Sequence, residues 1–278
     1  MGMKRQVFFS FFLILSLYIC EVFAGDIQTV NFHKLKLKDC LLPEDHPLQN
    51  KLKSLFEEPD MFQSPQHLRN AGFNVFDRIR RGFMVASHPT IKNYLIKKFQ
   101  DETPQKQQVN NYLRRINGAR TLREFIKLNN LQHIVVPRKW LYRLPKKFSD
   151  PDTGKRTYVM IAEKIDICSG EKDPDGEVAR RYNNMDFDIL RELCIVVYYF
   201  KGLDSGLQNM PFTYQNKIAF IDTEHWKNER DDFLRHTMHH LTPDRQEYAL
   251  GVLEELRAQD ESIHLQQQDE NNVMPNAG

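Results

Sequence analysis

The hydrophobic positions of this chain change their spacing several times, and each change marks the start of an expected element. Before residue 73 the spacing is helical. Leu48–Phe56 has the pattern of a short amphipathic helix that begins after Pro47, and Ser64 and Pro65 suit the N-cap and the first position of a second helix. Residues 25–72 are therefore predicted to form an N-terminal helical extension.

From residue 73 the apolar residues come in short runs typical of strands, separated by turn residues. The expected strands are Phe73–Phe76, Phe83–Ala86, Tyr94–Phe99, a fourth in which Ile134–Val136 leads into Trp140–Leu144, and Tyr158–Ala162. Between the third and fourth runs, Val109–Leu128 has helical spacing. Residues 73–165 therefore predict a five-stranded antiparallel sheet with one main helix.

The second half is mostly helical. From Asp186 on, apolar residues occur on nearly all sides of the expected helix, which indicates that the helix is buried. Lys201-Gly202, a basic residue followed by glycine, suits its C-terminal end. Lys217–Ile221 is an expected short strand, and Thr242–Asp244 begins a last helix that ends near Arg257. A polar, disordered tail is expected over residues 258–278. This order of elements predicts an α+β fold.

The first residues have the pattern of a secretory signal peptide. Lys4 and Arg5 precede the apolar run Val7–Ile19, and Val22-Phe23-Ala24 suits a cleavage site after residue 24. Residues 1–24 are therefore expected to be removed, and the protein to be exported to the periplasm or secreted. A retained membrane anchor is the alternative, for which the apolar run is short. No stable membrane span is expected after cleavage.

Composition and charge narrow the function only slightly. The formal net charge is +2, so no whole-chain attraction to nucleic acid is expected. Three cysteines remain after cleavage, Cys40, Cys168 and Cys194, and an odd number at wide spacing does not indicate a disulfide framework. One bridge with one spare thiol is left open. Cys194 lies in an apolar run and is expected to be a small buried residue.

Three polar residues in the second half have a spacing that suits phosphoryl transfer. Asn209 follows Asp204 by five positions, and Asp222 comes thirteen positions after Asn209, at the end of an apolar strand. Phosphoryl transfer needs a carboxylate near the attacking hydroxyl and oxygen ligands for Mg²⁺. Asp222 has a simpler alternative role as the cap of a following helix.

The segment Leu203–Glu224 resembles the catalytic loop and metal-binding strand of protein kinases and related small-molecule kinases. The resemblance implies that Asp204 is the catalytic base, that Asn209 and Asp222 bind Mg²⁺, and that ATP is the cofactor. It extends over residues 73–226 and implies a bilobal kinase-like fold. Residues 73–165 would form the N-lobe and residues 166–257 a reduced helical C-lobe.

The upstream half supplies further residues that the same resemblance implies. Lys97 matches the third-strand lysine that contacts the α- and β-phosphates, with Lys98 as the alternative because successive strand residues face opposite sides. Glu124, the acidic residue of the following helix, would be the lysine's partner. Glu163 lies where the strand runs into the hinge, whose backbone groups would hold adenine.

The chain also departs from the kinase pattern. The expected nucleotide-covering loop, Arg78–Gly82, has a single glycine, and Gly202-Leu203 stands where histidine and arginine are usual. Thr223-Glu224 replaces the usual Phe-Gly. These features are similar to compact, divergent kinase-like families. An exported Mg-ATP-dependent phosphoryl or nucleotidyl transferase is the first hypothesis. A secreted pseudokinase that binds or scaffolds a host protein is the second, and an unrelated α+β protein the third.

Four histidines near the end of the expected C-lobe raise the question of a metal. His236 and His240 are four positions apart and would share a helix face, with His225 and His239 nearby. No glutamate follows the first histidine, so the zinc-protease motif is absent. A surface helix is the favoured interpretation.

Overall fold

The computed structural model describes residues 27–30, 35–57, 61–62, 64–76, 83–99, 104–145, 157–168, 174–224 and 232–273. The expected signal peptide, the turn Arg78–Gly82 and His225 lie outside the described residues.

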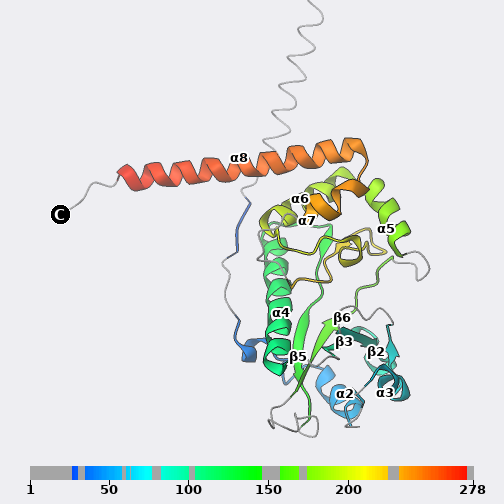
Figure 1. Ribbon diagram of the computed structural model, residues 1–278. Helices are drawn as coiled ribbons and strands as arrows, with labels where there is room; N and C mark the ends of the chain where they lie inside the picture. Colours follow the sequence, from blue (N-terminus) through cyan, green and yellow to red (C-terminus); the bar gives the residue numbers. More distant parts are fainter. Residues whose placement is uncertain are drawn as a thin grey trace, which may run out of the picture.

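Five antiparallel strands form the main sheet in the order β1-β2-β3-β6-β5 (Figure 1). The strands are β1 (Asn74–Val75), β2 (Phe83–Ser87), β3 (Tyr94–Phe99), β5 (Lys139–Arg143) and β6 (Tyr158–Glu163). Every neighbouring pair in this sheet is antiparallel. The predicted α+β class and the five-stranded antiparallel sheet are therefore confirmed.

The run Ile134–Val136 was expected to lead into the fourth strand, and the structure places it elsewhere. Its first two residues form β4 (Ile134–Val135), which pairs in parallel with β7 (Ile218–Ala219). Pro137 has no N–H to donate, so the main-sheet pairing begins only after it. As a result, the chain just before Asp222 is hydrogen-bonded to the segment that follows the long helix α4 (Gln105–Leu128).

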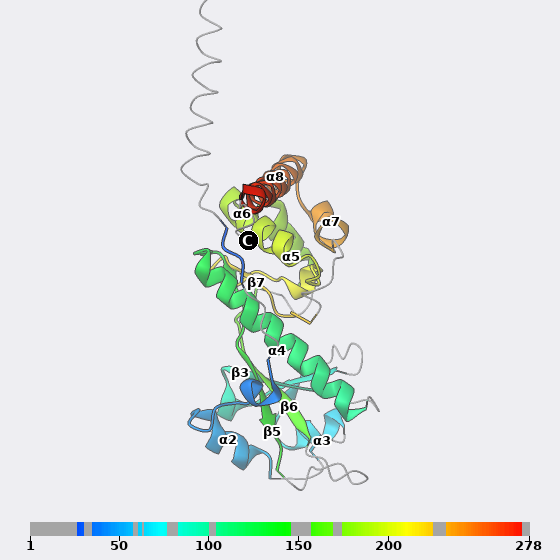
Figure 2. The same ribbon diagram turned by 90° about the vertical axis from the view of Figure 1, so that its left-hand side faces the viewer.

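Helices cover both faces of the main sheet (Figure 2). On one face α2 (Leu48–Leu55) and α3 (Pro65–Asn70) share an apolar core with alternate strand residues such as Ile96 and Ile161. As predicted, Ser64 caps α3, because its side chain accepts a hydrogen bond from the His67 N–H. On the other face, α4 packs on the strand residues that point to that side of the sheet, and these residues form a common buried core with α4. They are Phe99, Leu141 and Met160, with Tyr112 and Ile116 of α4.

The remaining helices surround a second core. They are α5 (Pro174–Asn183), α6 (Phe187–Tyr199), α7 (Asp232–His236) and α8 (Pro243–Val273), with 3-10 turns at Leu207–Asn209 and Met238–His240. Two other 3-10 turns, Leu37–Cys40 and Pro89–Ile91, pack against the main sheet instead. The predicted burial of α6 is confirmed, and the C-terminal end of α4 reaches this core through Phe125. Helix α5 was not predicted, because only Val178 and Tyr182 are buried among its residues whose side chains the structure describes.

Helix α8 is longer than expected. It runs to Val273 instead of ending near Arg257, and its last part projects past the other helices (Figure 1). The hydroxyls of Tyr198 and Tyr199 both donate to the Asp260 carboxylate, which holds α8 against α6 beyond the expected end. The stretch after Arg257 has no proline or glycine before its end and continues the helix. The prediction of a disordered tail was therefore wrong for residues 258–273.

The three cysteines of the expected mature chain are buried free thiols, so the bridge that the sequence left open does not form. Burial raises the pKa of the Cys194 thiol to about 12, consistent with its predicted packing role. None of the described helices is long and apolar enough to cross a bilayer.

The carboxylate of Glu192 on α6 connects α6 to the start of β4. It accepts hydrogen bonds from the backbone N–H groups of Gln132 (2.8 Å) and His133 (2.6 Å), and its side chain is only 14% exposed. Removing it with Glu192→Ala leaves these donors without their acceptor, which is expected to lower the free energy of unfolding by about 1–3 kcal/mol. Urea denaturation measures this loss. Glu192→Gln retains one acceptor oxygen and should lose less, and an equal loss in both variants would contradict the explanation.

Candidate functional site

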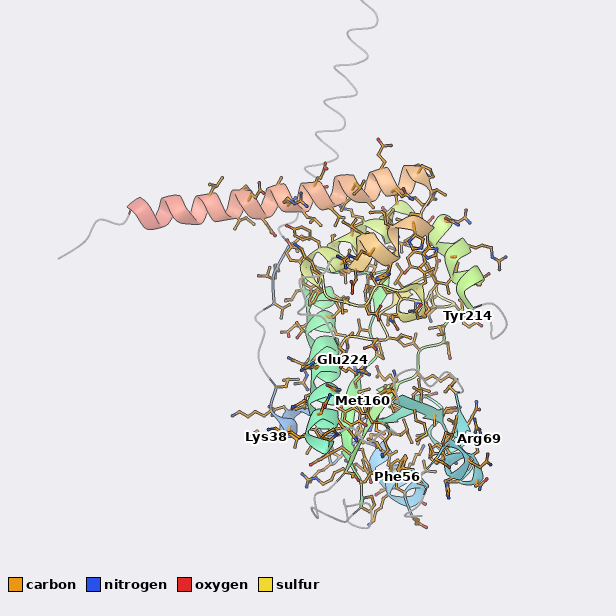
Figure 3. All side chains as sticks on the ribbon, in the orientation of Figure 1. Lys38, Phe56, Arg69, Met160, Tyr214 and Glu224 are labelled. Atoms are coloured by element: carbon orange, nitrogen blue, oxygen red, sulfur yellow. The ribbon has the colours of Figure 1, made fainter. Side chains whose placement is uncertain are left out.

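The apolar layer between the sheet and α4 ends in a group of charged residues, here called the charge cluster. It consists of Lys97 on β3, Arg115 on α4, Lys139 on β5, and Asp222 and Glu224 after β7. In the sheet Lys97 lies opposite Met160, which lies opposite Leu141. Side chains alternate along a strand, so Lys97 and Lys139 share the face that α4 covers. Figure 3 labels Met160 and Glu224 beside α4, near the middle of the molecule.

The structure distinguishes the two neighbouring lysines of β3. Burial lowers the pKa of Lys97, while the nearby Asp222 carboxylate raises it and Arg115 lowers it further. The Lys98 amine instead donates to the Phe99 carbonyl (3.0 Å) and lies 5.8 Å from the centre of the Phe62 ring, which belongs to the core with α2 and α3. Lys97 is therefore the lysine near Asp222.

The acidic partner on the helix is not where the sequence placed it. Glu124 is exposed on α4, and the residue of α4 that enters the charge cluster is basic. Arg115 forms ion pairs with Glu224 and with Asp222, whose Oδ2 is 3.5 Å from the guanidinium. The helix was expected to supply an acidic residue, but it supplies the arginine of the ion pair, and the segment after β7 supplies the glutamate.

Lys139 is a buried residue of the cluster that the sequence reasoning missed. It is 5% exposed, and its amine donates to the Ile221 carbonyl (3.1 Å) and the Thr223 hydroxyl (2.9 Å). The Thr223 hydroxyl in turn donates to the Arg115 carbonyl (2.7 Å). Burial, and then the charge of Lys97, lower the pKa of Lys139 to about 7. Its position two residues before the apolar Leu141 was the available signal for an inward-facing side chain.

Asp222 is held as an ionised carboxylate by basic neighbours. Burial opposes its ionisation, but Arg115, Lys139 and Lys97 outweigh burial and keep the pKa of Asp222 below its ordinary value. Its Oδ1 accepts the Glu224 backbone N–H (3.2 Å), and its Oδ2 faces Arg115. The side chain is 33% exposed, so one side of the cluster is open to solvent.

The loop of Asp204 and Asn209 adjoins the strand that leads to Asp222. The Ile221 N–H donates to the Asn209 carbonyl (3.0 Å), and the Asp204 carboxylate accepts the Gly206 N–H (3.2 Å). Behind the loop, the Thr237 hydroxyl donates to the Ser205 carbonyl. Both Asp204 and Asn209 are half-buried. One backbone hydrogen bond thus joins the loop that contains Asp204 and Asn209 to the residue before Asp222.

Glu163, at the end of the strand that was expected to run into the hinge, is hydrogen-bonded to Arg138. Its N–H donates to the Arg138 carbonyl (2.9 Å), and its carboxylate accepts the Arg138 N–H (2.8 Å). The next N–H, of Lys164, donates to the Asn93 carbonyl (2.8 Å). The N–H groups at both positions are engaged within the protein, so neither of these two donors is free to bind adenine.

The donor set around Asp222 does not fit a divalent metal in this arrangement. Both carboxylate oxygens already have partners, and the neighbouring side chains Arg115, Lys97 and Lys139 are basic. Mg²⁺ prefers several oxygen ligands and would be repelled by these groups. Across the described residues no three His, Cys, Asp or Glu side chains are grouped as metal ligands, which also leaves His236 and His240 without a third ligand.

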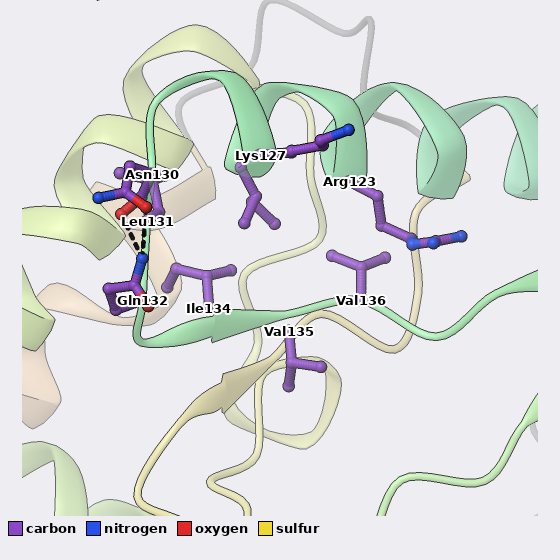
Figure 4. Close-up of a pocket in the computed structure, with 9 residues that line it drawn as sticks. Arg123, Lys127, Asn130, Leu131, Gln132, Ile134, Val135 and Val136 are labelled. Carbon is purple, nitrogen blue, oxygen red and sulfur yellow. Dashed lines mark hydrogen bonds between the residues drawn. The ribbon is translucent and has the colours of Figure 1, made fainter.

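Two cavities lie away from the charge cluster. One of about 290 Å³ lies between the end of α4 and the segment that contains β4, where Arg123 and Lys127 stand across from Ile134 and Val136 (Figure 4). The other, about 360 Å³, is lined by residues of α2 and β5 and by the segment that precedes α2. Neither is lined by a residue of the charge cluster.

No protein-family model matches this chain, and a search of curated proteins gives no significant match.

Proposed function

We propose that this chain is an exported protein with a bilobal kinase-like fold, which binds ATP and transfers a phosphoryl or nucleotidyl group to an acceptor. The observation that supports this most is that Lys97 and Asp222, far apart in the sequence, lie in one cluster. Lys97 is on the sheet face that α4 covers, and Asp222 contacts Arg115 of α4. The hydrogen bond from the Ile221 N–H to the Asn209 carbonyl adds the Asp204 loop to the same region.

Each residue has a defined role in this proposal. Lys97 would neutralise charge on the phosphates. Asp204 would accept the proton of the acceptor hydroxyl as its oxygen bonds to the γ-phosphorus. The bond from the γ-phosphorus to the β,γ-bridging oxygen breaks, and ADP leaves. Because the residues around Asp222 do not fit Mg²⁺, no step is assigned to a metal.

A pseudokinase is the second candidate, and one observation favours it. Arg115 pairs with Asp222, which in an active kinase-like enzyme would be free to bind the metal. In this alternative the protein binds a nucleotide without transferring a group, and acts as a secreted binding or scaffolding module. Its partner would be a protein, such as a host protein, and neither nucleic acid nor a membrane is proposed as a partner.

Export places a condition on both candidates. ATP is abundant in cytoplasm, so a secreted nucleotide-binding protein needs delivery to a compartment that contains ATP. A protein substrate in another cell would satisfy this condition. Fractionation of cells that express the protein tests export. Uncleaved protein, with residues 1–24 still attached, in the cytoplasmic fraction would contradict export.

The central test uses the chain without residues 1–24. Thermal-shift and calorimetric measurements detect ATP binding, and γ-labelled ATP detects transfer to the protein, to added proteins or to water. Binding with turnover supports the transferase, and binding without turnover supports the pseudokinase. Absence of ATP binding under all metal conditions would reject both.

Lys97 and Lys98 provide a matched pair for this site. Lys97→Met is expected to weaken ATP binding by about 10- to 100-fold, the effect of losing one hydrogen bond to a charged group. Lys98→Met removes the same charge from the opposite face of β3 and should leave the affinity unchanged. Calorimetry measures both. A larger loss in Lys98→Met would reassign the phosphate contact.

A further inference from the structure

The charge cluster contains more basic than acidic side chains. Lys97, Lys139 and Arg115 face the two carboxylates of Asp222 and Glu224. Three separate elements, β3, α4 and β5, bring the basic groups to one place. Bringing like charges together inside a protein is unfavourable unless a counter-charge is present. The pKa of Lys139 is lowered to about 7, so the cluster gains an excess positive charge only when this amine is protonated. A bound anion would favour the protonated amine, and the cluster is therefore suited to an anion.

Lys97 is the basic residue with unused binding capacity. Arg115 is engaged by Glu224 and Asp222, and Lys139 by the Ile221 carbonyl and the Thr223 hydroxyl. No hydrogen bond or ion pair joins the Lys97 amine to any other residue that the structure describes. The Asp222 side chain is 33% exposed, so the cluster is open to solvent on the side of Asp222, and a ligand can approach from there.

The same contacts disfavour a metal. A cation at Asp222 would have to displace Arg115 from Oδ2 and would lie beside two lysines. A polyphosphate without bound metal carries more negative charge than its Mg²⁺ complex, so it gains more from basic neighbours. In this cluster the protein itself supplies the positive charge that a metal supplies elsewhere.

We propose that the charge cluster binds the polyphosphate of a nucleotide directly, with Lys97 as the first contact and with no divalent metal between the phosphates and Asp222. Lys139 and Arg115 supply the positive charge behind this contact. The inference rests on the proposed function, because it takes ATP as the ligand of this site.

The test compares ATP binding to the chain without residues 1–24 by calorimetry, in excess EDTA and in excess Mg²⁺ at equal ionic strength. The expected affinity in EDTA is equal to or higher than that in Mg²⁺, and it should fall as salt is added. Inorganic tripolyphosphate in EDTA should compete with ATP, because the phosphates make the proposed contact.

The outcomes separate this inference from the proposed function. Binding that requires Mg²⁺ would overturn the metal-free site and leave the nucleotide-binding proposal in place. Absence of binding in both conditions would overturn both. The comparison uses the unaltered sequence, so it does not depend on whether a variant folds.

A variant pair adds a second readout. Lys139→Met is expected to weaken ATP binding in EDTA by about 10- to 100-fold. Lys92→Met removes an exposed lysine between β2 and β3 and should have no effect. Melting temperatures without ligand check that both variants fold. Unchanged affinity in a folded Lys139→Met variant would remove Lys139 from the site.

Discussion

Replacing Asp204 by asparagine is expected to lower ATP turnover by about 10²- to 10⁴-fold, the usual contribution of a positioned general base. The variant keeps the size of the side chain, and its amide oxygen can still accept the Gly206 N–H that Asp204 accepts at 3.2 Å. The loop should therefore keep its shape while losing its proton acceptor. ATP affinity should stay unchanged, because Asp204 is not a member of the charge cluster.

Two measurements on the same preparation check this result. Release of labelled phosphate or label transfer gives turnover, and calorimetry gives affinity. Asp188→Asn, at an exposed position in the first turn of α6, is the matched control and should behave as the unaltered protein. Unchanged turnover in Asp204→Asn would remove Asp204 from the catalytic role. Equal losses of affinity and turnover would show that the loop shapes the binding site.

Glu224→Gln is expected to lower the free energy of unfolding by about 3 kcal/mol, at the lower end of the cost of breaking a buried ion pair. Arg115 and Glu224 are 14% and 13% exposed, so water replaces little of the lost interaction. Asp222 remains near the guanidinium, but at 3.5 Å, and it is also close to Lys139 and Lys97. Urea denaturation measures the loss.

A double variant tests whether the pair itself is the cause. Arg115→Met combined with Glu224→Gln removes both charges, and it should recover part of the stability that Glu224→Gln loses. The recovery is not complete, because Asp222 also loses its contact with Arg115 and keeps only Lys139 and Lys97 as basic neighbours. Glu254→Gln, exposed on α8, is the control for a surface glutamate and should change stability by less than about 0.5 kcal/mol. A small cost for Glu224→Gln, similar to this control, would show that the pair adds little.

The packing of α4 explains why the sequence did not predict that the helix supplies a basic residue to the cluster and not an acidic one. The resemblance to kinases implies that the lysine on β3 pairs with an acidic residue of the following helix, and Glu124 is the acidic residue of that helix. Which residue of α4 faces the cluster depends on how the helix is rotated against the sheet. Tyr112 and Ile116 are the α4 residues buried against the sheet, which places the adjoining Arg115, and not the exposed Glu124, near Asp222.

The sequence by itself determined the local elements. The buried helix α6, the cap of α3 by Ser64 and the five strands of the main sheet follow from periodicity and residue type, which act over a few neighbouring positions. The run Ile134–Val136 is the exception, because it pairs outside this sheet. The spacing of Asp204, Asn209 and Asp222 is also a sequence property, and it identified the region that the structure connects by hydrogen bonds.

Only the tertiary structure decided which distant residues meet. In Tyr94–Phe99 apolar residues occur on both faces of the strand, so their alternation does not show which of Lys97 and Lys98 faces the cluster. The positions of α2 and α3 on one face and α4 on the other decide it. The pairing of β4 with β7 and the meeting of Lys139 with Thr223 likewise join segments far apart in the chain. Such contacts depend on how whole helices and strands pack against one another, and the pattern of neighbouring residues does not specify that packing.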